Sequence, residues 1–99
     1  MSIPLKNARG LLPEALAWLE DHALSPISVD AEPNRDGSAF ELLFWAGKRA
    51  IDPEKTPLRY QIFTAEEYEN GTYRELFGPR SMEAVRLYCE WLAAHPEEI

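Results

Sequence analysis

The first apolar pattern along the chain has helical spacing. Its members recur at intervals of three and four residues: Leu12, Ala15, Leu16, Leu19 and Ala23. Side chains at this spacing return to the same face of an α-helix. Pro13 suits the first helical position because its missing N–H would have no partner there. Pro26 disfavours helical geometry in the residue before it. The pattern predicts a helix over residues 13–23.

Alternation with a period of two follows, which is typical of a strand buried on one face. It predicts three strands, over residues 27–32, 39–46 and 58–63. Between the first two strands, Asp36-Gly37 supplies the positive φ angles that a tight reversal needs. Residues 47–57 contain two prolines and three basic side chains. We expect this segment to be an exposed loop.

Two segments after the third strand resemble helix starts. Thr64-Ala65-Glu66-Glu67 and Thr72-Tyr73-Arg74-Glu75 both fit the capping box. In this motif a threonine oxygen and a glutamate carboxylate bind otherwise unpaired amides. Gly78-Pro79 follows, and glycine before proline is typical of a helix end. We therefore expect two short helical turns over residues 64–77, separate from the next helix.

Residues 81–94 carry the broadest apolar face in the chain. Its members return at helical spacing: Met82, Val85, Leu87, Tyr88, Cys89, Trp91 and Leu92. The other side of the helix is a narrow polar strip of Glu83, Arg86 and Glu90. This distribution is typical of a helix that packs against a core.

The predicted elements follow the order α-β-β-β-α-α. Short connections between consecutive strands favour an antiparallel meander, and strands with one apolar face need helices to cover it. No linker rich in glycine and serine separates two apolar blocks. We predict a single compact domain over residues 1–99 with an α+β fold, in which a three-stranded antiparallel meander has its helices packed on one face.

Charge narrows the range of partners. The 99 residues contain 10 Lys and Arg against 17 Asp and Glu, a net charge of −7. Residues 64–99 hold three basic and eight acidic side chains, net −5. Such a balance disfavours direct binding of nucleic acid or of an anionic membrane. No apolar run approaches the ~20 residues of a membrane span, and the first residues lack the apolar region of a secretory signal. We expect a cytoplasmic protein.

Few side chains have a spacing that catalysis or cofactor binding requires. The single cysteine, Cys89, has apolar neighbours, which indicates a buried thiol. The two histidines, His22 and His95, each lie near a predicted helix end, where a structural role is common. Glycines occur singly, without the pattern of a phosphate-binding loop. The sequence therefore predicts no catalytic residue, no cofactor and no metal site.

The pleat of the strands divides their side chains between two faces. One set is expected to face the helices: Ile27, Val29, Phe40, Leu42, Phe44, Tyr60 and Ile62. The other set then faces outward: Asp30, Glu41, Leu43, Trp45, Arg59, Gln61 and Phe63. Leu43, Trp45 and Phe63 would form an apolar patch bordered by charges, as partner surfaces often do. The alternative is that residues 47–57 or the N-terminal segment cover this face.

A second candidate surface combines carboxylates with aromatic rings. Its members are Glu66, Glu67, Tyr68, Glu69, Tyr73 and Glu75. Carboxylates spaced along a rigid surface can imitate the phosphates of a nucleic acid, so this composition suits an inhibitor of a basic partner. A phage anti-host or anti-CRISPR protein is one such inhibitor. The simpler interpretation is two solvated helical turns whose tyrosines pack inward.

These observations lead to one main hypothesis and two alternatives. The main hypothesis is a non-enzymatic, acidic module that binds another protein through the outer sheet face, the acidic segment or both. The first alternative is a small enzyme or ligand carrier that uses His22 or His95 with carboxylates. The second is a structural subunit whose outer sheet face is buried in a homodimer.

Overall fold

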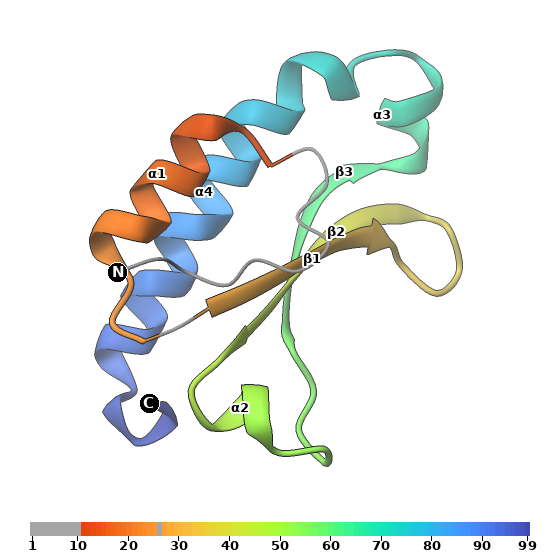
Figure 1. Ribbon diagram of the computed structural model, residues 1–99. Helices are drawn as coiled ribbons and strands as arrows, with labels where there is room; N and C mark the ends of the chain where they lie inside the picture. Colours follow the sequence, from red (N-terminus) through yellow and green to blue (C-terminus); the bar gives the residue numbers. More distant parts are fainter. Residues whose placement is uncertain (1–10, 26) are drawn as a thin grey trace.

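The chain folds into a three-stranded antiparallel sheet with its two longer helices on one face (Figure 1). A computed structural model describes residues 11–25 and 27–99. In chain order the elements are α1 (Pro13–His22), β1 (Ile27–Pro33), β2 (Ala39–Ala46), α2 (Lys48–Ile51), β3 (Leu58–Thr64), α3 (Ala65–Glu69), α4 (Tyr73–Ala94) and the 3₁₀ turn η1 (Pro96–Glu98). The α+β class and the antiparallel meander are thus confirmed.

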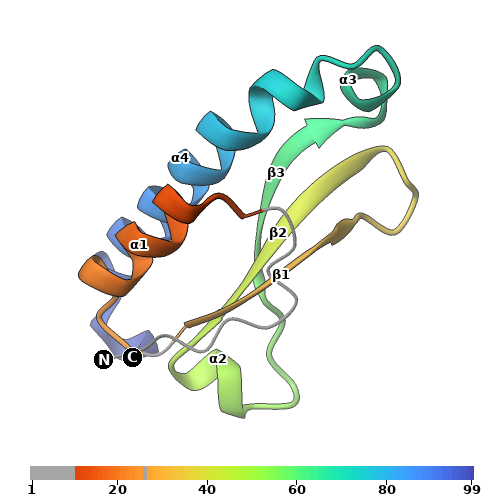
Figure 2. The same cartoon turned by 45° about the horizontal axis from the view of Figure 1, so that its top comes forward.

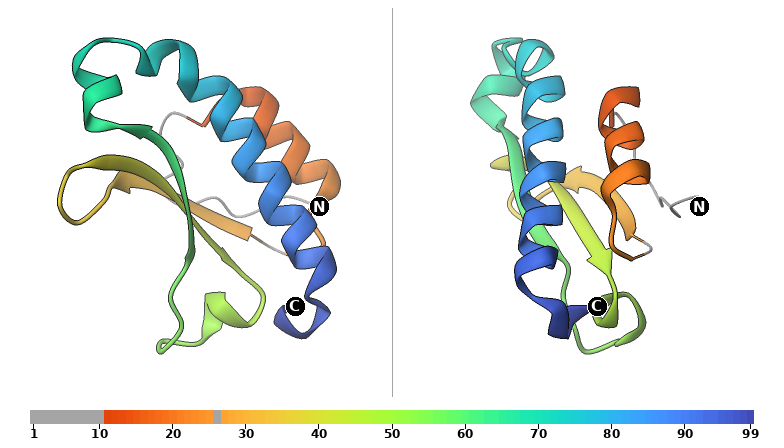
Figure 3. Two further views of the ribbon diagram at one scale, coloured as in Figure 1. Left: turned by 180° about the vertical axis from the view of Figure 1, so that it is seen from behind. Right: turned by 90° about the vertical axis from the view of Figure 1, so that its left-hand side faces the viewer.

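The sheet has the order β1-β2-β3, so each strand pairs with its neighbour in sequence. The right-hand view of Figure 3 shows α1 and α4 side by side in front of the strands. Figure 2 shows α2 at one end of the sheet and α3 at the other. The two faces and two ends of the sheet therefore have different surroundings.

The core fills the space between the sheet and the two long helices. Its largest fully buried side chains include Tyr88, Phe44, Leu19 and Ile62. The ring of Tyr88 lies 4.7 Å from that of Phe44, centroid to centroid. Burial of each such side chain stabilises the fold by roughly 1.5–3 kcal/mol, so this contact between α4 and β2 is a principal source of stability.

The helix α4 is longer than the sequence suggested. It continues through Gly78 and Pro79 without a break, so the predicted helix end at this pair is wrong. A Cβ atom at position 78 would lie 2.6 Å from Leu12 Cδ1, which shows that the glycine allows α1 to approach α4 closely. Pro79 is exposed, on the side of the helix where a bend costs little packing.

The start of α4 also differs from expectation. Thr72 precedes the helix but makes no side-chain capping bond, so the second predicted capping box is wrong. Its backbone is instead fixed by the Asn70 side chain, whose Oδ1 accepts from the Thr72 amide at 2.9 Å. Further along α4, Leu87 is 44% exposed and does not belong to the core as predicted.

A short helix interrupts the predicted loop 47–57. Gly47 has φ +54°, a left-handed conformation that lets the chain turn sharply out of β2 into α2. The guanidinium of Arg49 in α2 pairs with the carboxylate of Glu98 at 3.0 Å. This contact joins α2 to η1, two segments far apart in the sequence.

A β-bulge in β3 reverses the predicted direction of one aromatic side chain. Phe40 pairs with Phe63, whereas the next residue of β2, Glu41, pairs with Gln61. Ile62 is therefore an extra residue, and Phe63 lies on the helix side instead of the outer side. The outward position predicted for Phe63 is wrong. The β2 strand itself keeps its regular alternation, with Phe44 in the core cluster and Trp45 outside it.

Candidate functional site

An apolar pocket opens at one end of the sheet, between the β1–β2 hairpin and α3. Figures 1 and 2 show these two segments at the same end of the molecule. The pocket has a volume of about 440 Å³. It is lined by Pro33, Gly37, Ala39, Phe40, Phe63, Ala65, Tyr68 and Glu69. Three of the predicted partner-binding residues, Phe63, Tyr68 and Glu69, therefore meet in one hollow.

The hairpin wall of the pocket is held by local hydrogen bonds. The Ser38 amide donates to Asp36 Oδ1 at 2.9 Å, and the Asn34 side-chain amide donates to the Ser38 hydroxyl at 3.0 Å. The bonds from the side chain and backbone of Ser38 hold the pKa of Asp36 below its usual value. These contacts are those of a turn rich in Asp, Asn and Ser, and they hold the backbone of this wall in its turn conformation.

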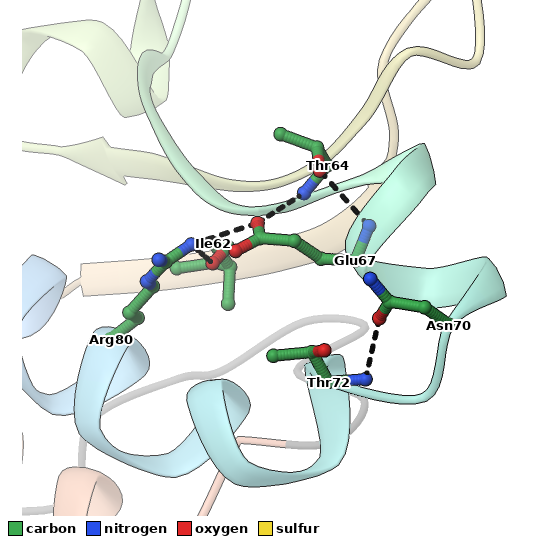
Figure 4. Close-up of polar contacts among 6 residues, drawn as sticks. All are labelled: Ile62, Thr64, Glu67, Asn70, Thr72 and Arg80. Atoms are coloured by element: carbon green, nitrogen blue, oxygen red, sulfur yellow. Dashed lines mark hydrogen bonds and ion pairs between the residues drawn. The ribbon is translucent and has the colours of Figure 1, made fainter.

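The opposite wall, α3, begins with the predicted capping box, which is confirmed. Thr64 Oγ1 accepts from the Glu67 amide at 3.1 Å, and Glu67 Oε1 accepts from the Thr64 amide at 2.9 Å (Figure 4). Arg80 of α4 binds the same carboxylate and the Ile62 carbonyl oxygen, each at 3.0 Å. The Ala65 amide donates to the Ser38 carbonyl at 2.8 Å, which ties this wall to the hairpin.

These contacts give Glu67 a structural role that the neighbouring glutamates lack in the described part of the chain. The Thr64 backbone amide lowers the pKa of the Glu67 carboxyl, partial burial opposes this, and Arg80 adds to the lowering. The carboxylate is therefore engaged in holding α3 to β3 and α4. Among residues 11–25 and 27–99, Glu67 is the predicted partner-binding carboxylate that forms an ion pair.

The aromatic rings at this end form a stacked series. The rings of Phe40 and Phe63 are 4.9 Å apart and parallel within 5°. Tyr68 continues the series, at 6.1 Å and 18° from Phe63, and Tyr73 lies 4.7 Å from Tyr68. Tyr68 is 57% exposed, so the series runs from the core to solvent. The expectation that the tyrosines pack inward is therefore not met by Tyr68. It is met in part by Tyr73, which is half-buried.

Exposed carboxylates occur on α3 and in the first turn of α4. Glu66, Glu69 and Glu75 are exposed, and no side-chain hydrogen bond or ion pair joins them to other residues in the described part of the chain. Glu69 also lines the pocket itself. Arg35 of the hairpin lines a separate hollow with Asp36 and Arg59. The pocket thus combines an apolar aromatic wall with the Glu69 carboxylate, which has no ion pair within the described residues.

The outer sheet face holds the remaining predicted residues. Leu43 is only 4% exposed and offers almost no surface to a partner. Trp45 is half-buried, and its Nε1 donates to Asp30 Oδ2 at 3.2 Å. Because Phe63 has turned to the helix side, the apolar patch of three residues does not form. Trp45 remains a separate candidate contact beside Ile51, which is the most exposed large hydrophobic residue described.

Both histidines are placed by the same helix-end arrangement. His22 stacks on Trp18 at 4.1 Å, and its Nδ1 lies 3.0 Å from the Trp18 carbonyl oxygen. His95 stacks on Trp91 at 4.2 Å, with Nδ1 2.7 Å from the Trp91 carbonyl oxygen. In each case the imidazole contacts the carbonyl oxygen four residues earlier, near the end of its helix. These contacts are structural, and neither histidine lines the pocket.

Residues 11–25 and 27–99 offer little support for a metal site or a reactive thiol. Within these ranges no three His, Cys, Asp or Glu side chains lie close enough together to hold a metal ion. Burial raises the pKa of the Cys89 thiol to about 11, so the thiolate form is scarce at neutral pH. In the same part of the chain no helix has both the length and the apolar character to cross a membrane.

Comparison with known proteins identifies no relative. No protein-family model, no curated protein and no solved structure matches this chain. The functional argument therefore depends on the geometry of the pocket and its charges.

The sequence indicated part of this site but not its composition. It singled out the acidic and aromatic residues of the α3 region, which are close together along the chain. It assigned Phe40 to the core and gave no role to Pro33, Ala39 or Ala65, which complete the lining. The place of Phe40 directly after the turn residues 33–38 was the available signal in the sequence, because strand ends next to a hairpin are often incompletely covered.

Proposed function

We propose that this protein is a small acidic module that binds another protein through the aromatic and carboxylate end of the sheet. The single observation that carries this proposal is the pocket of about 440 Å³ in which Phe63, Tyr68 and Glu69 meet. Large exposed aromatic groups beside a hollow are typical anchors of protein interfaces. No catalytic role is assigned to any residue.

The charge distribution supports a partner with a basic surface. The net charge is −7, and residues 64–99, which include α3, contribute −5 of it. Unpaired surface carboxylates attract a basic partner over long distance and speed its association. A protein that handles nucleic acid presents such a surface, so we propose inhibition of a partner of this kind, as a phage anti-host or anti-CRISPR protein would achieve it.

The structure allows a charge test that spares the fold. In the variant Glu66→Lys/Glu69→Lys/Glu75→Lys, three exposed charges are reversed and Glu67 keeps its capping contacts. Short random peptides displayed on phage are selected on the wild-type protein, with counter-selection on this variant. We expect enrichment of peptides that combine basic and apolar residues, and weaker binding of them as salt rises.

A matched control separates the two surfaces first considered. Trp45→Ala alters the outer sheet face and leaves the pocket intact. It should bind the selected peptides as the wild-type protein does. Enrichment of neutral or acidic peptides, equal binding by the charge-reversed variant, or loss of binding in Trp45→Ala would overturn the proposal.

A further inference from the structure

We propose that the pocket receives one arginine side chain of the partner, whose guanidinium stacks on the aromatic wall and pairs with Glu69. This inference rests on the proposed function and names the group that the pocket recognises. It follows from the shape of the wall, the isolated charge and the rigidity of both sides.

The aromatic wall suits a flat cation. The rings of Phe40, Phe63 and Tyr68 form a series with successive interplanar angles of 5° and 18°, in which Phe63 is only 6% exposed and Tyr68, at 57%, is the ring open to a ligand. A guanidinium is planar and stacks on such rings. Pro33, Ala39 and Ala65 supply an apolar lining for the methylene groups that precede it.

The described part of the chain contains two such contacts between an arginine and an aromatic ring. The guanidinium carbon of Arg74 lies 5.7 Å from the centre of the Tyr73 ring, and that of Arg49 lies 5.5 Å from the Trp91 ring. In both cases an aromatic face on α4 receives an arginine. Tyr68 is exposed, and no arginine of the described chain occupies the corresponding position over it.

The charge in the pocket favours a cation over a neutral group. Glu69 is the only charged side chain among the described lining residues, and no ion pair there engages it. A carboxylate can accept two parallel hydrogen bonds from an arginine. Arginine is favoured over lysine because a guanidinium is less strongly hydrated than an ammonium group and loses less on entering an apolar hollow.

Both walls are held by hydrogen bonds within the chain. The hairpin wall is held by the contacts among Asn34, Asp36 and Ser38, and α3 is held by Thr64 and Glu67. The bond from the Ala65 amide to the Ser38 carbonyl sets the separation of the two walls. A preorganised pocket avoids part of the entropy cost of binding, which makes recognition of a single side chain effective.

The test compares peptides that differ in one side chain. A basic peptide selected on the wild-type protein is synthesised with arginine, lysine or citrulline at each arginine in turn. Citrulline keeps the shape of arginine but has no charge. At one position we expect citrulline to weaken binding about tenfold and lysine several-fold, measured by calorimetry. Amide NMR signals of residues 63–69 should shift with the arginine peptide.

Protein variants locate the effect in the pocket. Tyr68→Ala and Glu69→Gln should each reduce the preference for arginine over citrulline to about twofold or less. Glu90→Gln removes the same charge from an exposed position on α4 and should keep the full preference. Circular dichroism checks that each variant is folded. The peptide series on the wild-type protein gives a result even if Tyr68→Ala does not fold.

The outcomes distinguish this inference from the proposed function. If basic peptides bind with salt dependence but no arginine is more sensitive to citrulline than the others, the pocket does not receive an arginine, and the proposed function stands. Equal effects of Glu69→Gln and Glu90→Gln would have the same meaning. NMR shifts confined to the outer sheet face would overturn both proposals, because the peptide would then bind away from the pocket. If no basic peptide binds at all, both proposals fail.

Discussion

Replacement of Gly47 by alanine tests how the end of the sheet opposite the pocket is held together. A Cβ atom at this position would overlap the Glu98 carbonyl oxygen and lie 2.9 Å from Ile99 Cα. Both neighbours are backbone atoms, so no side-chain rotation relieves the overlap. Residues 96–99 must move away from α2 to admit the methyl group.

Two contributions to the free energy of unfolding follow from this geometry. A residue with a side chain at φ +54° and ψ −129° costs about 1–3 kcal/mol in backbone strain alone. Displacement of residues 96–99 also breaks the Arg49–Glu98 pair, whose side chains are only 15% and 16% exposed. A hydrogen bond between charged groups contributes about 1.5–3 kcal/mol. We therefore expect a total loss of about 3–5 kcal/mol.

The assay is urea unfolding monitored by circular dichroism. Four proteins are compared: the full chain and a chain that stops after residue 95, each with glycine or alanine at position 47. In the shorter chain Gly47→Ala should cost only the backbone strain, so its effect should be smaller by about 2 kcal/mol. Gly71→Ala is a further control, because Gly71 has φ +85° and no atom within 4 Å of the added Cβ. Equal costs of Gly47→Ala in the long and short chains would refute the contact between Gly47 and residues 96–99.

Three further predictions concern stability and reactivity. Trp91→Ala should destabilise the fold by about 3 kcal/mol, because the half-buried ring stacks on Tyr88 at 6.2 Å, and a loss below ~1 kcal/mol by thermal unfolding would contradict this. Glu67→Gln should be less stable than the wild-type protein above the ordinary glutamate pKa of about 4.3, because the folded pKa is lowered. The difference in the free energy of unfolding should disappear as the pH falls through that folded pKa. A difference independent of pH would show that the negative charge of Glu67 does not strengthen its contact with the Thr64 amide. Cys89 should react slowly with iodoacetamide at neutral pH until urea unfolds the chain, because burial raises its pKa to about 11, whereas rapid labelling of the folded protein would contradict its burial.

The candidate site shows where sequence reasoning succeeded and where it failed. The acidic and aromatic residues of α3 lie within a few positions of one another, so their common location followed from the chain order. Phe40 joins them from a different strand, through its pairing with Phe63. That pairing depends on the bulge at Ile62, which has no signature in the local alternation of residues 58–63.

The sequence by itself determined the elements whose signals are local. The spacing of Leu12, Ala15 and Leu19 specified α1, the period of two specified three strands, and Thr64 with Glu67 specified the start of α3. These features depend on the geometry of a few consecutive residues. They were therefore readable without knowledge of the fold.

Only the tertiary structure decided the features that depend on contacts across the molecule. Gly78 lies inside α4, where the absence of a Cβ atom leaves room for Leu12 to pack against the helix. The helix therefore continues where a glycine before proline suggested an end. The bulge in β3 turned Phe63 toward α4 and removed it from the outer face. Burial of an aromatic ring on the helix side stabilises the fold by more than the lost regularity of one strand costs, and this balance is set by the assembled core, not by any single segment.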